Sequence, residues 1–260
     1  MKLLRFMTKE ISPCFGWIDQ DMVGKIEGNP FGEYRRLDAK YQLTSVKILP
    51  PCEPTKIICI GRNYEAHANE HNAEIPEIPL LFLKPPSALI SAGENIIIPP
   101  QSNKVEHEAE LAVIIKKPGR WIQTQEAFDF ILGHTIANDV TARDLQRQDT
   151  QWTRGKGFDT FCPLGPWMET EFDSSDALIT CHVNGELRQM ASTRDMVFTI
   201  NQIISFASSV MTLNPGDVLL TGTPSGVGAL LPGDNVSINI EGIGSLTNSV
   251  IAAPQVNSEE

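Results

Sequence analysis

One apolar run, EAELAVIIKK from Glu108 to Lys117, constrains the fold more than any other part of the sequence. Beyond Glu110 an extended chain would be apolar on both faces, which is typical of a strand in the interior of a protein. Such a strand requires a substantial core. The 260 residues, of which 41% are hydrophobic, are enough for one large domain, or for one large and one small domain.

Short extended segments dominate the rest of the chain and predict a β-rich protein of the α+β class. Residues 1 to about 46 alternate in strand-like pieces, which predicts a small β-rich N-terminal subdomain followed by the proline-rich connector VKILPPCEPTK. KIICI then predicts a buried strand that Gly61 ends. Near the C-terminus, VLLTGTPSGVG and VSINI predict a second β-rich half.

Three segments are compatible with helix. Residues 63–74 are polar, and Thr124 is expected to cap a short helix that runs through Ile131 and stops before Gly133. After Thr199, apolar residues recur at intervals of three and four up to the turn NPGD, which predicts a helix packed on the core rather than a functional element.

The charge and cysteine content restrict the partners and the compartment. A net charge of −11 and a pI near 4.9 disfavour binding to nucleic acid or to an anionic membrane. The five cysteines are scattered and form no CxxC pair, so neither a disulfide framework nor a zinc knuckle is indicated. We find no signal peptide and no apolar run of the length of a membrane span. We therefore expect a cytoplasmic protein with reduced thiols.

Three carboxylates are candidates for a metal site. Glu108 and Glu110 are two residues apart, so on a strand both side chains point to the same face. An arbitrary E-x-E is usually a solvated face, but this face continues into apolar residues of the core. Asp139 is a third acid in an apolar extended run, where a turn or capping role is the alternative. Carboxylate ligands favour a hard cation, Mg²⁺ first, then Mn²⁺ or Ca²⁺.

The stretch GRNYEAHANEHNAE offers two histidine–glutamate pairs of identical spacing. His67 with Glu70 and His71 with Glu74 are both three residues apart, so spacing alone does not choose between them. A solvated acidic helix is the simpler interpretation. The composition also suits a segment that orders over a ligand as a lid.

Taken together, these segments resemble the fumarylacetoacetate hydrolase family. The matching text covers most of residues 56–250 and comprises IGRNYEAHANE, PLLFLKPPSALI, VEHEAELAVII, NDVTARDLQ, WTRGKGFDTFCPLGP, VNGELRQ and LLTGTPSGVG. The resemblance implies a mixed β-sheet roll as the catalytic domain over residues 55–254, with residues 1–50 as the small N-terminal subdomain. It also implies a homodimer.

The same resemblance implies roles for individual residues. Three groups of positions are expected to form one site: the metal ligands Glu108, Glu110 and Asp139; the catalytic His67, Glu70 and Lys156; and the substrate-binding Arg62, Arg143, Gln146 and Thr223. Other interpretations stand beside these. Arg143 could simply pair with the adjacent Asp144, Lys156 could be a surface lysine between two glycines, and Thr223 could belong to an ordinary turn.

The implied chemistry is that of 2-oxo acids. True fumarylacetoacetases have a much longer N-terminal domain than about 50 residues, so the chain resembles the shorter members of the family. We expect hydrolysis of a C–C bond in an acylpyruvate-like β-diketo acid through a metal-bound enolate, with a small 2-oxo acid or dicarboxylate as substrate. The alternatives are decarboxylation or keto–enol tautomerisation of oxaloacetate, isomerisation or decarboxylation of a hydroxymuconate-type dienoate, and, last, a non-catalytic metal-binding protein.

Overall fold

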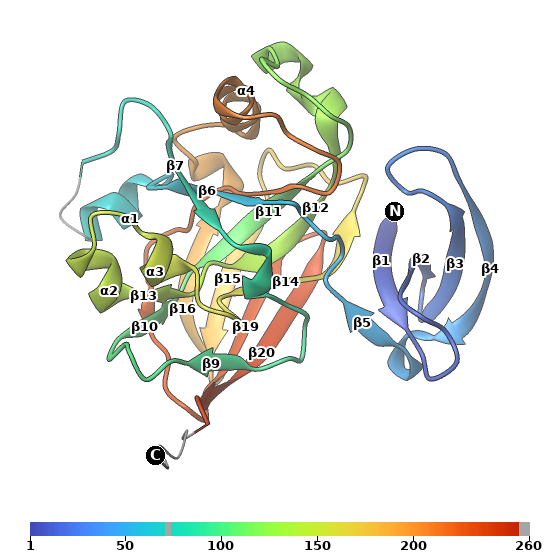
Figure 1. Ribbon diagram of the computed structural model, residues 1–260, viewed down its shortest axis with the longest axis horizontal. Coiled ribbons are helices and arrows are strands. Elements are labelled where there is room, and N and C mark those ends of the chain that lie inside the picture. The colour runs from blue at the N-terminus through green and yellow to red at the C-terminus, as the bar shows by residue number, and fades with distance from the viewer. Residues whose placement is uncertain (71–73, 255–260) are drawn as a thin grey trace, which may run out of the picture.

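The computed structural model describes residues 1–70 and 74–254, and Figure 1 shows that strands dominate it. Two large sheets form the body of the molecule, and helices are short and lie at its edges. The β-rich α+β class expected from the sequence is confirmed. None of the helices in the described part of the chain is long and apolar enough to cross a membrane.

The N-terminal strands form an antiparallel meander that stands to one side of the body (Figure 1). It consists of β1 (Lys2–Met7), β2 (Cys14–Asp19), β3 (Met22–Gly28) and β4 (Tyr34–Gln42), followed by the 3₁₀ turn η1 (Leu43–Ser45) and β5 (Lys47–Leu49), which pairs with β1. A small core of Leu4, Phe6 and Val23 fills it. Strand β1 also pairs with β14 (Cys162–Glu169), so the meander continues the main sheet.

Strand β11 (Ala109–Ile115) lies in the interior of the main sheet, and all seven of its residues are buried. Its strand order is β4-β3-β2-β1-β14-β12-β11-β17-β6-β7, where β12 is Ile131–Asn138, β17 is Val218–Leu220, β6 is Ile57–Gly61 and β7 is Leu80–Lys84. The short β8 (Leu89–Ile90) pairs with β14. The interior strand predicted from EAELAVIIKK and the buried strand predicted from KIICI are therefore both confirmed.

The second sheet packs against the first and closes the core. Its order is β16 (Glu186–Ser192), β15 (Leu178–Val183), β19 (Asn235–Ile240), β20 (Gly244–Ala252) and β9 (Ile96–Ile98). Leu111 and Ile136 of the main sheet share one apolar cluster with Ile179 and Ile238 of the second sheet. Because β19 alternates between buried and exposed residues, it presents only one face to this core.

A third, small sheet joins segments that are far apart in the sequence. It pairs β10 (Val105–His107) with β13 (Thr141–Ala142) on one side and with β18 (Gly228–Ala229) on the other. The beginning of β11, the end of β12 and the loop after β17 thereby lie together at one end of the strands of the main sheet. The candidate site lies at this end of the strands.

Two helices lie in segments where the sequence predicts them. The lid candidate contains α1 (Glu65–Glu70), and residues 71–73 of its predicted span lie outside the described residues. The apolar stripe after Thr199 forms α4 (Ile200–Val210), which begins with a capping box of Thr199 and Gln202. The remaining helical segments are α2 (Arg143–Gln148), α3 (Thr153–Lys156), η2 (Pro86–Ala88), η3 (Thr124–Phe130) and η4 (Thr193–Asp195).

The predicted cap at Thr124 is wrong. The segment is a 3₁₀ helix whose capping residue is Gln123, and no side chain caps it. Instead, the backbone just before it is held by Ser208 of α4, because Trp121 N–H donates to the carbonyl of Ser208 and Ile122 N–H donates to its hydroxyl. Tertiary contact therefore replaces the local cap.

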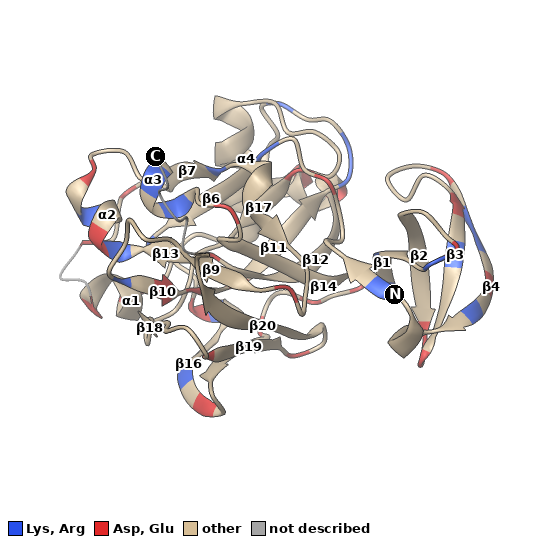
Figure 2. Ribbon diagram, turned by 60° about the horizontal axis from the view of Figure 1, so that its bottom comes forward, with Lys and Arg blue, Asp and Glu red and all other residues tan. Residues whose placement is uncertain are grey.

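Charged side chains of both signs are interspersed along the chain, and Figure 2 shows basic segments in α2 and α3. These two helices lie beside the ends of β10 and β13. Arg143 of α2 and Lys156 of α3 both form ion pairs with Glu108, which lies at that end of the strands.

Candidate active site

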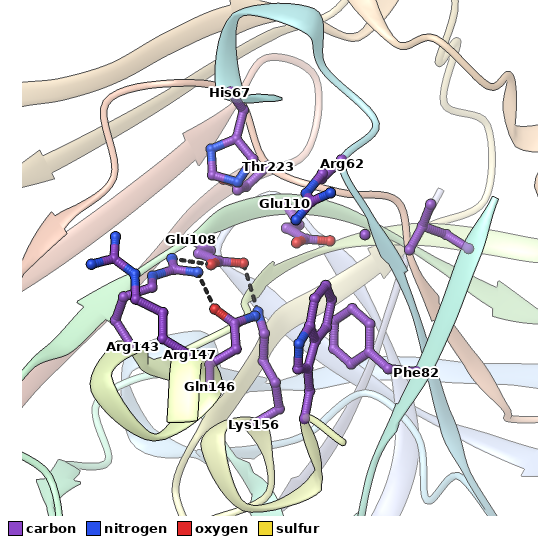
Figure 3. Close-up of a pocket in the computed structure, with 13 residues that line it drawn as sticks. Arg62, His67, Phe82, Glu108, Glu110, Arg143, Gln146, Arg147, Lys156 and Thr223 are labelled. Atoms are coloured by element: carbon purple, nitrogen blue, oxygen red, sulfur yellow. Dashed lines mark hydrogen bonds and ion pairs between the residues drawn. The ribbon is translucent and has the colours of Figure 1, made fainter. Parts of the chain in front are cut away.

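A cavity of about 250 Å³ opens where β6, β7, β11, α1, α2, α3 and the loop after β17 meet (Figure 3). Eight of the ten residues expected to form the site line it, and the other two contact a residue that does. The lining residues are Ile60, Gly61, Arg62, His67, Phe82, Glu108, Glu110, Arg143, Gln146, Arg147, Trp152, Lys156 and Thr223. Asp139 lies behind this wall and contacts Lys156, and Glu70 contacts His67.

The three candidate metal ligands come together because β11 and β12 are antiparallel neighbours. Glu108 precedes β11, Glu110 lies in it, and Asp139 follows β12, with Ala109 opposite Asn138 in the register. Asp139 N–H donates to the carbonyl of Glu108 over 2.8 Å. One oxygen from each carboxylate lies within 4.8 Å of the others, and all three side chains are buried. Glu108 and Glu110 therefore do not form a solvated face, and the buried Asp139 does not act as a simple capping residue.

Two buried lysines balance part of this negative charge. Lys156 Nζ lies 2.8 Å from Oε2 of Glu108 and 2.6 Å from Oδ2 of Asp139, so Lys156 is not a surface lysine. Lys84, at the end of β7, lies 2.6 Å from Oδ1 of Asp139 and also donates to the carbonyl of Val140. No site role was predicted for Lys84, which appeared only within the segment PLLFLKPPSALI that contributes to the family resemblance.

Arg143 does not pair with the adjacent Asp144. Its Nε donates to Oε2 of Glu106 over 2.6 Å, its Nη2 contacts Glu108, and its Nη1 donates to Oε1 of Gln146 over 2.6 Å. The carboxylate of Asp144 instead accepts from Ser102 and from the backbone of Asn103. The alternative interpretation, a local salt bridge between Arg143 and Asp144, is therefore wrong, because the start of α2 points these two side chains in different directions. Glu106 had no signal of its own.

The electrostatic environments of Glu108 and Glu110 differ. Burial opposes the ionised form of Glu108, but Lys156 and Arg143 outweigh it and lower the pKa of this carboxyl. Burial, reinforced by Asp139 and Glu108, raises the pKa of Glu110 well above its ordinary value. Among the described residues no lysine or arginine forms an ion pair with Glu110, which accepts a hydrogen bond from Gly222 N–H over 2.6 Å.

These observations fit a bound divalent cation. The donor set is three buried carboxylates, which hard cations such as Mg²⁺ and Mn²⁺ prefer. A cation there would also provide the counter-charge that Glu110 lacks among the described side chains. The ligand chemistry and the charge balance therefore both favour a divalent cation at this position.

His67 and Glu70 lie on α1, above the carboxylates. His67 is buried and its Nδ1 lies 3.6 Å from Oε2 of Glu70. The carboxylate of Glu70 is held in turn by Gly226 N–H, at 3.1 Å and 3.2 Å from its two oxygens. Figure 3 shows the imidazole directed toward the cavity over Glu108. His71, the competing histidine, lies outside the described residues, and Glu74 is exposed.

Further residues shape the wall of the cavity. Arg62 follows β6 with a φ of 62°, and its side chain reaches toward Glu110 (Figure 3). Phe82 and Trp152 pack edge to face with ring centroids 5.3 Å apart, and Lys156 Nζ lies 4.9 Å from the Phe82 ring. The sequence assigned no role to Phe82, Trp152 or Arg147, because a single aromatic or arginine residue carries no signal of which cavity it faces.

Two family profiles together account for nearly the whole chain. Residues 56–251 match the family described as fumarylacetoacetate (FAA) hydrolase C-terminal, and residues 1–51 match the one described as Rv2993c-like, N-terminal. The first match contains the candidate site residues described above.

Individual proteins of known sequence or structure are also similar. The mitochondrial oxaloacetate tautomerase FAHD2B of Bos taurus is 44% identical over 216 residues, which are 78% of this chain and 69% of that protein. The crystal structure of 2-hydroxyhepta-2,4-diene-1,7-dioate isomerase from Mycobacterium marinum superposes with a TM-score of 0.91 at 40% identity, covering 98% of this chain and 100% of that one.

A hydrolase is similar as well. Maleylpyruvate hydrolase from Sphingobium sp. SYK-6, solved in complex with manganese(II) ion and pyruvate, superposes with a TM-score of 0.80 at 30% identity. The similarity covers 98% of this chain and 100% of that chain. Similar proteins thus include a tautomerase, an isomerase and a hydrolase.

Proposed function

The chain belongs to the fumarylacetoacetate hydrolase family, and from this premise we propose that it is a divalent-metal-dependent enzyme acting on a small 2-oxo acid with a second carbonyl or carboxyl group. The observation that carries the proposal is the position of His67, which is paired with Glu70 and faces the cavity above three clustered carboxylates. A proton-transfer group and a candidate metal site therefore lie at the same cavity.

Glu108, Glu110 and Asp139 would hold the cation, with Mg²⁺ as the first choice and Mn²⁺ or Ca²⁺ as alternatives. When bound, the cation would polarise the 2-oxo carbonyl and stabilise negative charge that develops on its oxygen. The similarity to a hydrolase solved with manganese and pyruvate supports this assignment.

The size and charge of the cavity support a small anionic substrate. Its volume of about 250 Å³ is below the range typical of sites for drug-sized ligands. The lining residues Arg62, Arg143, Arg147 and Lys156 are basic, so a dianionic acid would find cations on several sides. We assign Arg62, Arg143, Gln146 and Thr223 to substrate binding.

We propose hydrolysis of an acylpyruvate-like substrate as the first candidate reaction. His67, oriented by Glu70, would remove a proton from water, and the resulting hydroxide would attack the carbonyl distal to the 2-oxo acid. The C–C bond then breaks, the hydroxyl oxygen stays with the acyl fragment as a carboxylic acid, and the carbon of the pyruvate fragment takes up a proton. Lys156 and Gln146 would stabilise the oxyanion of the attacked carbonyl.

The second candidate is keto–enol tautomerisation of oxaloacetate. The specific support is the 44% identity with an oxaloacetate tautomerase. In this reaction His67 would take a proton from the carbon next to the 2-oxo group and return it to the oxygen, so that no water takes part. The same residues serve both candidates, and the difference lies in whether a water molecule or a substrate carbon faces His67.

A panel of three acids separates the candidates. The purified protein, with Mg²⁺ or Mn²⁺, is assayed with acetylpyruvate, with oxaloacetate, and with 2-hydroxyhepta-2,4-diene-1,7-dioate, following loss of the diketone or enol absorbance and the appearance of pyruvate. Loss of acetylpyruvate with pyruvate formation supports hydrolysis. Faster equilibration of oxaloacetate without pyruvate supports tautomerisation, and pyruvate from oxaloacetate indicates decarboxylation.

The panel needs an independent binding measurement. Oxalate resembles an enolate of a 2-oxo acid, so Mg²⁺ and oxalate together should raise the midpoint of thermal unfolding. If none of the three acids is turned over and oxalate produces no shift with either metal, the proposal is wrong.

The domain organisation and assembly complete the proposal. We propose residues 1–50 as a small N-terminal subdomain and residues 55–254 as the catalytic domain, supported by the proline-rich connector between them and by the two separate family matches. A homodimer stays a prediction from the resemblance, and a cytoplasmic location stays a prediction from the cysteine content and the N-terminal sequence. Light scattering on the purified protein tests the former.

A further inference from the structure

Gln189 is a fully buried amide on a strand that is otherwise largely exposed. Its neighbours on β16, Arg188 and Met190, are exposed, whereas Gln189 points inward. Its hydrogen bonds reach two segments of the candidate site, the backbone of Ala109 and the loop that contains Thr223 and Pro224, and also the side chain of His107. The segment VNGELRQ thus supplies a residue to the site from the second sheet.

The orientation of this amide follows from two backbone groups. Ala109 N–H can only donate, and it lies 3.1 Å from Oε1 of Gln189. The carbonyl of Pro224 can only accept, and it lies 2.8 Å from Nε2. Nε2 therefore faces the loop and Oε1 faces β11. His107 Nδ1, 2.9 Å from Oε1, agrees with this orientation when it carries a proton.

This orientation determines the role of the Thr223 hydroxyl. Gln189 Nε2 lies 2.8 Å from Oγ1 of Thr223 and donates to it, so the single hydroxyl proton cannot point toward Gln189. The proton instead points to the carbonyl of Ala109, 2.9 Å away, or into the cavity that Thr223 lines. A substrate carboxylate that enters the cavity can thus accept a hydrogen bond from the Thr223 hydroxyl.

We propose that Gln189 is a positioning residue that makes Thr223 a hydrogen-bond donor toward the substrate and ties its loop to the peptide between Glu108 and Glu110. The proposal rests on the proposed function, in which Thr223 contacts the carboxylate of a 2-oxo acid. Ala109 connects the two parts, because its N–H donates to Gln189 and its carbonyl accepts from Thr223.

Two substitutions distinguish a directional role from simple packing. Q189E keeps an acceptor for Ala109 N–H and has a similar shape, but it offers a second acceptor where Nε2 donated. The Thr223 hydroxyl would then donate its hydrogen bond to the carboxylate that Q189E introduces and would no longer donate to the substrate. Q189M removes both the donor to Thr223 and the acceptor for Ala109 N–H, but it adds no acceptor that could redirect the Thr223 hydroxyl, so we expect it to weaken ligand binding less than Q189E does.

Calorimetric titration of oxalate in saturating Mg²⁺ tests this with a double-mutant cycle of wild type, Q189E, T223V and Q189E/T223V. We expect Q189E to raise the oxalate Kd by about tenfold, the equivalent of about 1.4 kcal/mol. In the T223V background the same change should have no further effect, since the hydroxyl that it redirects is gone. Q202E is the matched control, because Gln202 caps α4 away from the cavity, and its Kd should equal that of wild type.

Each outcome decides the question. An unchanged Kd in Q189E, or an equal loss in the T223V background, would overturn the role of Gln189 while leaving the proposed function in place. A wild-type protein that neither binds oxalate nor turns over any of the three acids would instead overturn the proposed function and this inference with it. If Q189E fails to fold, the cycle is run with Q189M, where a loss of about threefold that disappears in T223V supports the proposal and an additive loss contradicts it.

Discussion

Lys84 Nζ lies 2.6 Å from Oδ1 of Asp139, and both side chains are inaccessible to solvent. Removing one partner of a buried pair costs about 3–5 kcal/mol when the other charge is left uncompensated. Lys156 still pairs with Asp139 in the variant, so we expect Lys84→Met to lower the free energy of unfolding by an amount up to this range, measured by urea denaturation without metal. Adding Mg²⁺ should restore part of the loss, because a cation bound to Asp139 replaces the missing charge.

Lys47→Met is the control for this prediction. Lys47 pairs with Glu94 over 3.1 Å, but both side chains are substantially exposed. An exposed pair contributes at most about 1 kcal/mol. If Lys84→Met costs no more than Lys47→Met, the buried pair does not have the importance assigned to it.

Glu110→Gln should separate metal binding from folding. The amide matches the uncharged carboxyl that burial favours at Glu110, and its oxygen can still accept from Gly222 N–H, so the metal-free protein should keep its thermal midpoint. The stabilisation by Mg²⁺, about 2.7 kcal/mol at a concentration of 100 times Kd for a single site, should disappear. Thermal unfolding with and without Mg²⁺ measures both, and Glu241→Gln, at an exposed position, should respond to Mg²⁺ as wild type does. A Mg²⁺ response retained in Glu110→Gln would remove Glu110 from the ligand set.

His67→Ala should abolish proton transfer without abolishing ligand binding. Loss of a general base typically lowers kcat by 10²–10⁴-fold. We expect a decrease in this range with the substrate identified by the panel, while the oxalate affinity in Mg²⁺ stays within about twofold of wild type, because the metal ligands are untouched. His182→Ala, on β15 of the second sheet, should keep its activity. Full activity in His67→Ala would rule out the role of this histidine.

Gly226→Ala should displace the loop that holds Glu70. Gly226 has a φ of 95°, and a Cβ atom there would lie 2.0 Å from the carbonyl oxygen of Arg188. The loop would have to move, and the hydrogen bond from Gly226 N–H to Glu70 would move with it. We expect a loss of more than about 3 kcal/mol in the free energy of unfolding, above the 1–3 kcal/mol of backbone strain alone, together with a lower kcat.

Gly233→Ala is the matched control for strain without collision. Gly233 has a φ of 100°, and nothing lies within 4 Å of its would-be Cβ atom. It should lose only the strain term, about 1–3 kcal/mol, and keep the wild-type kcat. Equal effects of the two substitutions would mean that the contact with Arg188 is unimportant.

His134 should make the protein less stable in mild acid. Burial lowers the pKa of this histidine from 6.5 to about 4. Below pH 6.5 the unfolded chain therefore binds a proton that the native protein does not bind until about pH 4, and stability decreases as the pH falls through this range, by about 3 kcal/mol at most. Urea denaturation at pH 7 and pH 4.5 should show a smaller decrease for His134→Gln than for wild type. Equal decreases would contradict the prediction.

Local patterns were sufficient for the elements that bury one continuous apolar surface. The run after Glu110 predicted the interior strand β11, and the stripe after Thr199 predicted α4, because the apolar pattern of an element depends on residues close together in the chain. The E-x-E spacing likewise placed Glu108 and Glu110 on one face. The cap at Thr124 failed because Ser208, a residue far along the chain, holds that segment instead.

The partners of the site residues depended on the pairing of distant strands. Lys84 and Asp139 are 55 residues apart, Glu106 and Arg143 are 37 apart, and Gln189 and Thr223 are 34 apart. Sequence spacing relates none of these pairs, since each contact exists only when the register of β7, β10 or β16 against its neighbours is set. The identities of the acids, the lysine and the histidine could thus be read along the chain. Their ion pairs, their burial and the direction of their hydrogen bonds arise from packing two sheets against each other, which brings these charges out of water and next to one another.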